Sequence, residues 1–300
     1  MATTEELRDD AHEADDTDDR DEDEGEESNG ASKKSESHDA HAAAPKVYER
    51  RAGMGARNIL TITRREFKSY FDSIVAYVVV CTTLLVVGVW FFFFGFWQVD
   101  RASVSRLFEG VACLPSLLSF LVLPLVTMRA LAEEKRSGTI ELLITMPVKD
   151  SEVILGKFFA ALGLTSVLLV CTLLYPVAMF VWPWHMGALD WGPVWTGYFG
   201  LLLMSSAGIA MGMMFSSLTE SQIVAFFVTA ATLALLWFVG TIVEFVHGPI
   251  GDAISFVSFQ TRFLPFSRGL IDTRAVIYFL SITILCLLVA FRSLESRKWS

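Results

Sequence analysis

The chain has 300 residues, of which 53% are hydrophobic and only 19% are charged. A soluble domain of this length would carry more charge on its surface, so the composition excludes an ordinary soluble protein and predicts an all-α integral membrane protein. The charge is also segregated: residues 1–45 carry 17 acidic and 4 basic residues, a net charge of −13, whereas the rest of the chain carries 16 acidic and 20 basic residues, a net charge of +4.

Residues 1–45 are predicted to form a disordered acidic cytoplasmic tail. This segment contains no aromatic residue and consists largely of Asp, Glu, Ser, His and Ala. Such a composition cannot bury enough apolar surface to offset the entropy of ordering the chain. A solubilising role is the simpler interpretation, and a binding role is the alternative.

Residues 46–72 are predicted to be a basic linker followed by an amphipathic elbow helix. Over 56–71, apolar residues alternate with cations in a roughly helical pattern. A basic amphipathic helix lies naturally among phospholipid headgroups, so we expect this helix to be interfacial and to lead into the first membrane span. The cations of the segment are Lys46, Arg50, Arg51, Arg57, Arg64, Arg65 and Lys68, and the apolar residues are Ile59, Ile62, Phe67, Tyr70 and Phe71.

A membrane domain covering 73–292 is predicted to contain six spans, because six apolar runs are long enough to cross a bilayer. Prolines inside the second and third runs predict kinks, since proline removes a helix hydrogen bond. The segment 247–274 is long and not very polar, and it can form one or two short interfacial or re-entrant helices. Residues 293–300 are predicted to be a short cytoplasmic tail. The six runs cover about 74–97, 111–128, 157–182, 194–215, 223–246 and 275–291, and the prolines are Pro115, Pro124 and Pro176.

The distribution of Lys and Arg predicts the orientation of the spans. With the N-terminus inside, the inner segments carry 15 basic residues and the outer segments carry 5. Loops rich in Lys and Arg stay in the cytoplasm, so both termini are predicted to be cytoplasmic.

A charged stretch, Met128 to Lys157, separates the second and third spans and is placed in the cytoplasm by this orientation. Within it, Gly138 and Pro147 bracket a short amphipathic piece, Thr139–Met146. Its apolar residues Ile140, Leu143 and Ile144 have helical spacing and define one face, with Glu141 on the other. Asp150 or Ser151 is expected to cap the next helix, with Glu152 in its first turn. The alternative interpretation is an ordinary solvated loop.

The sequence offers little chemistry for an enzyme. It contains no G-x-x-x-x-G-K-[ST] phosphate loop and no Cys/His cluster with metal-ligand spacing, so neither ATP hydrolysis by this chain nor a metal site is predicted. The histidines outside the tail, His185 and His247, fall in predicted outer loops, which argues against an intramembrane protease. The four cysteines lie in or beside apolar runs and are expected to be small buried hydrophobes.

Two features of the spans are candidate sites. Gly208 and Gly212 form a G-x-x-x-G pattern that suits close helix packing, either within the chain or in a dimer. Glu244 is the acid within a predicted span, near the outer end of the fifth. It is either an interfacial residue facing water or part of an outer gate.

The stretch MRALAEEKRSGTIELLITMPVKDSEVILGKFFAAL, residues 128–162, resembles the permease subunits of ABC-2 type transporters. Within that group, it is most similar to the gliding-motility-associated ABC permeases, which are related to the permease of nitrous-oxide-reductase maturation. Further stretches fit the same pattern, and together they cover about 54–292, without the acidic tail. They are REFKSYFDSIVAYVV, GMMFSSLTESQIVAFF and FQTRFLPFSRGLIDTRAVIYFLS.

The resemblance implies an ABC-2 (type V exporter-like) permease fold with six membrane helices, an elbow helix and a short cytoplasmic coupling helix. It implies two permease chains, identical or related, in the inner (cytoplasmic) membrane, each with an ATP-binding subunit. ATP and Mg would bind that subunit, with no cofactor held by the permease, and no nucleic acid would be a partner. The alternative is a membrane scaffold that recruits an ATPase for motility or envelope assembly. The residues implied in ATPase coupling are Glu133, Glu134, Lys135, Arg136, Gly138, Thr139, Glu141 and Leu142.

Overall fold

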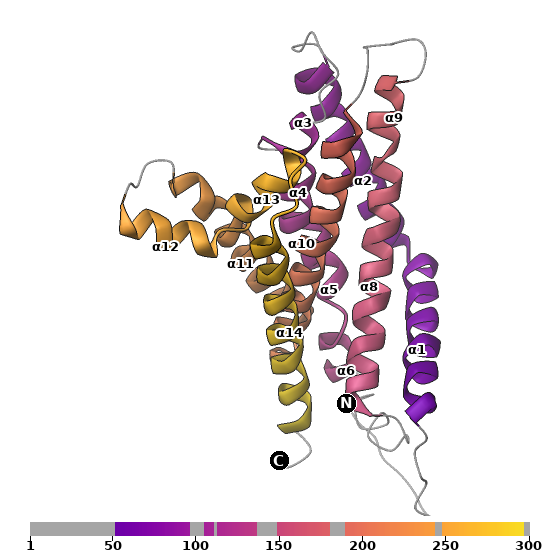
Figure 1. The fold of residues 1–300 in the computed structure, drawn as a ribbon. Coiled ribbons are helices and arrows are strands. Elements are labelled where there is room, and N and C mark those ends of the chain that lie inside the picture. Colours follow the sequence, from indigo (N-terminus) through magenta and orange to yellow (C-terminus); the bar gives the residue numbers. More distant parts are fainter. Residues whose placement is uncertain are drawn as a thin grey trace, which may run out of the picture. The chain divides into compact units, whose positions relative to one another are not determined.

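A computed structural model describes residues 52–96, 105–110, 113–136, 149–180, 190–243 and 248–296, all within one compact unit of the chain, Arg50–Ser300 (Figure 1). Over these residues the regular structure is helical, with no β-strand, which confirms the predicted all-α fold. The acidic tail, residues 1–45, lies outside the described residues. The helices are α1 (Ala52–Asp72), α2 (Ile74–Trp90), η1 (Phe91–Phe96), α3 (Ser105–Phe108), α4 (Leu114–Leu117), η2 (Leu118–Val122), α5 (Leu123–Thr127), α6 (Ala132–Arg136), α8 (Asp150–Thr172), α9 (Leu174–Phe180), α10 (Trp191–Leu218), α11 (Gln222–Val243), α12 (Pro249–Val257), α13 (Phe259–Ser267) and α14 (Thr273–Ser296).

The described chain contains six helical stretches that are long and apolar enough to cross a membrane, as predicted. Each overlaps one of the apolar runs in the sequence. The third begins earlier than expected, at Asp150, because α1 covers the polar residues of its first two turns. Lys149 therefore takes the N-cap position in place of Asp150 or Ser151. The stretches are Ile74–Phe93, Leu114–Arg136, Asp150–Ala178, Trp191–Leu218, Gln222–Ile242 and Thr273–Ser296.

The predicted elbow helix forms as α1 and runs alongside the first half of α8 (Figure 1). The two helices approach closely at Gly156, where an added Cβ would lie 2.6 Å from Cγ2 of Ile62. The Thr63 hydroxyl donates a hydrogen bond to the Gly156 carbonyl at 3.2 Å. The cations Arg57, Arg64, Arg65 and Lys68 lie on the opposite, exposed side of α1. Thus the apolar face of this amphipathic helix is used for packing within the chain.

Helix α10 is the most buried of the spans and forms the centre of the bundle. Its glycines allow neighbouring side chains to sit directly on its backbone. An added Cβ would lie 2.4 Å from Leu123 Cδ1 at Gly208 and 2.0 Å from Thr127 Oγ1 at Gly212. Both glycines of the G-x-x-x-G pattern therefore face α5 of the same chain. On another face of α10, Ser206 hydrogen-bonds Thr283 of α14 at 3.2 Å.

The prolines coincide with departures from regular α-helix. Between Pro115 and Pro124, the second span adopts the π-helical turn η2. In the third span the break falls at Leu173, between α8 and α9. Pro176 has no N–H to bond the carbonyl four residues earlier, that of Thr172, so the helix is interrupted one turn before the proline.

The segment between the fifth and sixth spans contains two short helices, α12 and α13. The Ser258 hydroxyl caps α13 by accepting a hydrogen bond from the Thr261 N–H at 3.2 Å. Phe259, Phe263 and Phe266 of α13 are buried in the core. Helix α12 projects sideways from the bundle (Figure 1).

The surface of the bundle is strongly apolar. In the most apolar 18 residues of three spans, few residues are buried within the chain. The buried share is 28% in Ile74–Phe93, 22% in Gln222–Ile242 and 28% in Thr273–Ser296. Side chains such as Leu85, Leu235 and Leu285 are exposed, as expected of residues that face lipid or another protein. The expectation that all cysteines are buried is wrong, because Cys81 and Cys171 lie on this exposed surface.

The close approach of α5 to α10 makes Gly212 sensitive to any side chain. Gly212→Ala should lower the stability of the chain by about 1–3 kcal/mol through overpacking, partly offset by a gain of about 1 kcal/mol in helix propensity. Thermal unfolding in detergent measures the change. Gly192→Ala in the same helix is the control, because its Cβ would meet only Asp190 Oδ1, at 3.2 Å. Equal stability of the two variants would contradict this packing.

Candidate functional site

The described residues of the set predicted for ATPase coupling lie at the end of the bundle where α6 follows α5 and α8 begins. Glu133, Glu134, Lys135 and Arg136 form α6. Glu133 and Arg136 are exposed, whereas Glu134 and Lys135 are partly buried. The remaining predicted coupling residues, Gly138, Thr139, Glu141 and Leu142, lie outside the described residues, as does Glu244. Their roles stay predictions.

A buried ammonium group joins three helices at this end. The side chain of Lys157 in α8 is only 7% exposed, and its Nζ lies 2.8 Å from Glu134 Oε1 of α6. The same Nζ lies 3.4 Å from Glu66 Oε2 of α1. A charge removed from water needs such partners, because an unpaired buried charge is strongly unfavourable. Lys157 thereby holds both α6 and α1 against α8.

A second buried charge lies about one turn earlier on α8. Glu152 is 6% exposed, and its Oε2 accepts a hydrogen bond from Asn58 Nδ2 of α1 at 3.1 Å. Gly55 leaves room for this carboxylate, since an added Cβ there would come within 3.2 Å of Glu152 Oε1. The polar first turns of α8 are therefore covered by α1, although sequence analysis placed the start of this span at Lys157.

Serines at the end of α10 fix the turn between α5 and α6. The Ser216 hydroxyl accepts hydrogen bonds from the backbone N–H groups of Leu131, at 3.1 Å, and Ala132, at 3.0 Å. It donates one to the Met128 carbonyl at 3.3 Å, so its single donor and both acceptor positions are used.

The neighbouring Ser217 carbonyl accepts hydrogen bonds from two further elements. One comes from the Lys135 ammonium of α6, and the other from the Ser293 hydroxyl of α14 at 3.1 Å. The α5–α6 turn is therefore tied to both α10 and α14. Sequence analysis missed these serines as site residues, and the only signal was a pair of hydroxyls at the end of an apolar span.

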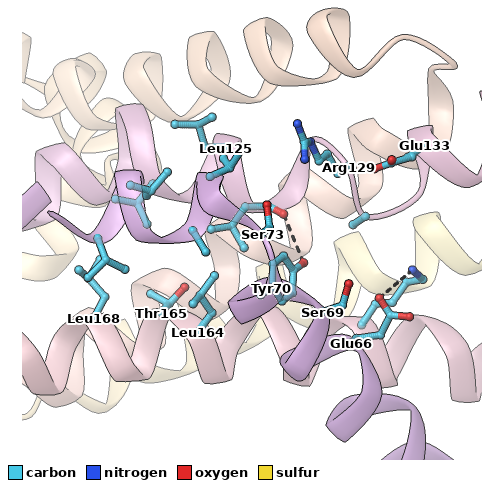
Figure 2. Close-up of a pocket in the computed structure, with 18 of the residues that line it drawn as sticks. Glu66, Ser69, Tyr70, Ser73, Leu125, Arg129, Glu133, Leu164, Thr165 and Leu168 are labelled. Atoms are coloured by element: carbon cyan, nitrogen blue, oxygen red, sulfur yellow. Dashed lines mark hydrogen bonds and ion pairs between the residues drawn. The ribbon is translucent and has the colours of Figure 1, made fainter. Parts of the chain in front are cut away.

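A cavity of about 320 Å³ adjoins the Lys157 ion pair and lies between α1, α2, α5 and α8 (Figure 2). Glu66, Glu133 and Glu134 reach its polar end, and the rest is lined mainly by Leu, Val and Ala side chains, with the hydroxyls of Ser73 and Thr165 among them. Tyr70 stands between the two parts, and its hydroxyl donates to the Val126 carbonyl at 3.3 Å. Burial, and secondarily the charge of Glu66, raises the pKa of the Tyr70 hydroxyl, so this group stays protonated.

In the part of the chain that the structure describes, no group of three or more His, Cys, Asp or Glu side chains is placed to hold a metal ion. The polar contacts observed at this end of the bundle are ion pairs and hydrogen bonds. Such contacts can hold helices together and pass a displacement of one helix to its neighbours.

Comparison with known proteins bears on the same residues. The ABC-2 family transporter protein model matches residues 110–292, which is more than half of the chain. The match includes five of the six spans, α6, Lys157 and Ser216, and it begins after α1 and α2. No curated protein matches the chain. Permeases of this family form the non-catalytic transmembrane part of an ABC transporter, so membership implies an ATP-binding partner. The chain therefore belongs to the ABC-2 transporter family and is a multi-pass membrane permease.

Proposed function

We propose that this permease moves a substrate outward across the cytoplasmic membrane, driven by ATP that a separate subunit hydrolyses. The observation that carries the proposal is the α6–α8 junction. On a six-span ABC-2 permease, the Glu134–Lys157 ion pair joins the two helices that flank residues 137–148, and this stretch includes the predicted coupling helix, Thr139–Met146. The charged residues that flank this segment within Met128 to Lys157 support a contact outside the bilayer.

The proposed assembly contains two permease chains and two ATP-binding subunits, with ATP and Mg on the latter. In the described unit, α1, α6 and the end of α14 lie at the same end of the bundle (Figure 1). The segments predicted to be inside carry 15 basic residues and those predicted to be outside carry 5. This difference supports placing this end, and both termini, in the cytoplasm. The residue pattern of 128–162 further favours kinship with the gliding-motility-associated permeases.

A movement of the 137–148 segment would reach most of the bundle through the contacts of α6. Glu134 passes it to α8 through Lys157. Ser216 and Ser217 pass it to α10 and, through Ser293, to α14. The exposed residues Glu133 and Arg136 are the described members of the coupling set best placed to meet a partner.

The proposal is tested with the ATPase that co-purifies with the chain in mild detergent. Inside-out vesicles containing both proteins should take up components of a labelled lipid or peptide extract only when ATP is present. Nucleotide turnover without uptake would contradict transport and favour the scaffold alternative.

Glu141→Arg should weaken ATPase binding while leaving membrane insertion and thermal stability unchanged. Reversing one charge costs on the order of 2–5 kcal/mol when the pair is buried at an interface, and much less at its rim. Pull-down of the ATPase measures the effect. Asp252→Arg, the same charge change on the exposed surface of α12, is the control and should bind normally. Full ATPase binding by Glu141→Arg would contradict the coupling assignment.

Ser216→Ala should loosen the α5–α6 turn, because two backbone N–H groups lose their acceptor. We expect a loss of stability of about 1–3 kcal/mol, together with weaker stimulation of the partner ATPase. Thermal unfolding and ATP turnover in nanodiscs measure the two effects. Ser255→Ala removes an exposed serine hydroxyl from α12 and should change neither. Unchanged turnover in a destabilised Ser216→Ala would limit this serine to a structural role.

A further inference from the structure

The cavity between α1, α2, α5 and α8 is amphipathic along its length. Figure 2 shows Leu168 at one end, Glu66 and Glu133 at the other, and Tyr70 between them. The apolar part lies within three membrane spans, and the polar part lies where those spans end. The cavity thus has the polarity of a single lipid leaflet, with a polar surface above hydrocarbon.

The walls of an apolar cavity gain packing contacts with an apolar group that enters it. In a bilayer, acyl chains are the apolar groups at hand to fill it. The volume of about 320 Å³ is at the small end of the range of ligand cavities, roughly 300–1,000 Å³. It therefore suits one acyl chain of a lipid whose second chain remains in the bilayer.

The charges at the polar end select among headgroups. Three carboxylates, those of Glu66, Glu133 and Glu134, and two cations, Arg129 and Lys157, line this end, which gives a net charge of −1. Lys157 is already engaged by Glu134 and Glu66. Arg129 is exposed and forms no ion pair with the residues that the structure describes.

A guanidinium group matches the geometry of a phosphate. The negative net charge disfavours a headgroup that is itself anionic and favours one that carries an ammonium group. A primary ammonium can donate hydrogen bonds to carboxylates, whereas a quaternary ammonium cannot. The chemistry at the polar end therefore fits an ethanolamine headgroup better than glycerol or choline.

We propose that this cavity binds one phosphatidylethanolamine molecule, with its phosphate on Arg129, its ammonium group among the carboxylates and one acyl chain between α2, α5 and α8. The bound lipid fills the space between α1 and the membrane spans. This site goes beyond the proposed transport function and does not depend on an ATPase.

The test uses the full chain, reconstituted in vesicles of equal parts phosphatidylethanolamine, phosphatidylglycerol and phosphatidylcholine. After extraction in mild detergent, native mass spectrometry measures the retained lipid. Wild type should retain phosphatidylethanolamine in preference to the other two lipids. Val79→Phe fills the cavity and should lose the bound lipid, whereas Val78→Phe, on the exposed side of the same helix, should keep it.

Arg129→Ala tests the headgroup contact without altering the core, which keeps the proposal decidable if Val79→Phe fails to fold. Loss of a charge-assisted contact should reduce retention roughly tenfold. Arg64→Ala, on the exposed face of α1, is the matched control and should behave as wild type. Equal retention by Val79→Phe and Val78→Phe, or by Arg129→Ala and Arg64→Ala, would overturn the site. Equal retention of phosphatidylglycerol by wild type would overturn the headgroup assignment.

Discussion

The pairing of one buried ammonium group governs the arrangement of α1, α6 and α8. Lys157 can leave water only if carboxylates accompany it, and those of Glu134 and Glu66 come from two other elements. Replacing either acid would leave Lys157 with a single partner in a largely buried site. The sequence places Glu66 and Lys157 91 residues apart, so this one contact closes a long loop of the chain. It brings the amphipathic α1, which precedes the spans, into the packed bundle.

Helix α10 supplies the second constraint, since its backbone serves as a packing surface along its length. Side chains of α3, α13 and α5 rest on its glycines, with Phe108 against Gly197, Phe266 against Gly200 and Thr127 against Gly212. In its last turn α10 makes hydrogen bonds in place of glycine contacts, and the Ser216 hydroxyl binds the backbone of the α5–α6 turn. Packing within the span and hydrogen bonding at its end therefore set the position of α6 together. In lipid, where apolar burial does not drive helices together, both kinds of contact are needed.

Hydropathy predicted the six spans because a bilayer demands long apolar helices, and periodicity predicted α1 because its apolar residues keep helical spacing. Neither hydropathy nor periodicity shows which group a polar side chain will contact in the fold. Lys157 was predicted to begin the third span, whereas it lies inside α8, buried and paired with Glu66 and Glu134. The role of Ser216 was missed for the same reason, since its partners lie 84 and 85 residues away. The prolines correctly marked irregular regions, but the break near Pro176 falls at the lost hydrogen bond, one turn upstream.

The carboxylates of Glu66 and Glu134 both hold helices together and line the proposed lipid site. Lipid binding and ATPase binding are therefore linked thermodynamically. Glu134 helps to hold α6 on α8 and also lines the polar end of the cavity, as Glu66 does for α1. A lipid headgroup that meets these side chains binds best in one arrangement of α1, α6 and α8. An ATPase that contacts the segment after α6 also favours a particular position of that helix. Two ligands that bias one structural element alter each other's affinity by the same factor, in both directions. If both sites operate, phosphatidylethanolamine content should therefore tune ATPase binding, and Arg129→Ala should abolish that dependence while leaving the ATPase contact itself in place.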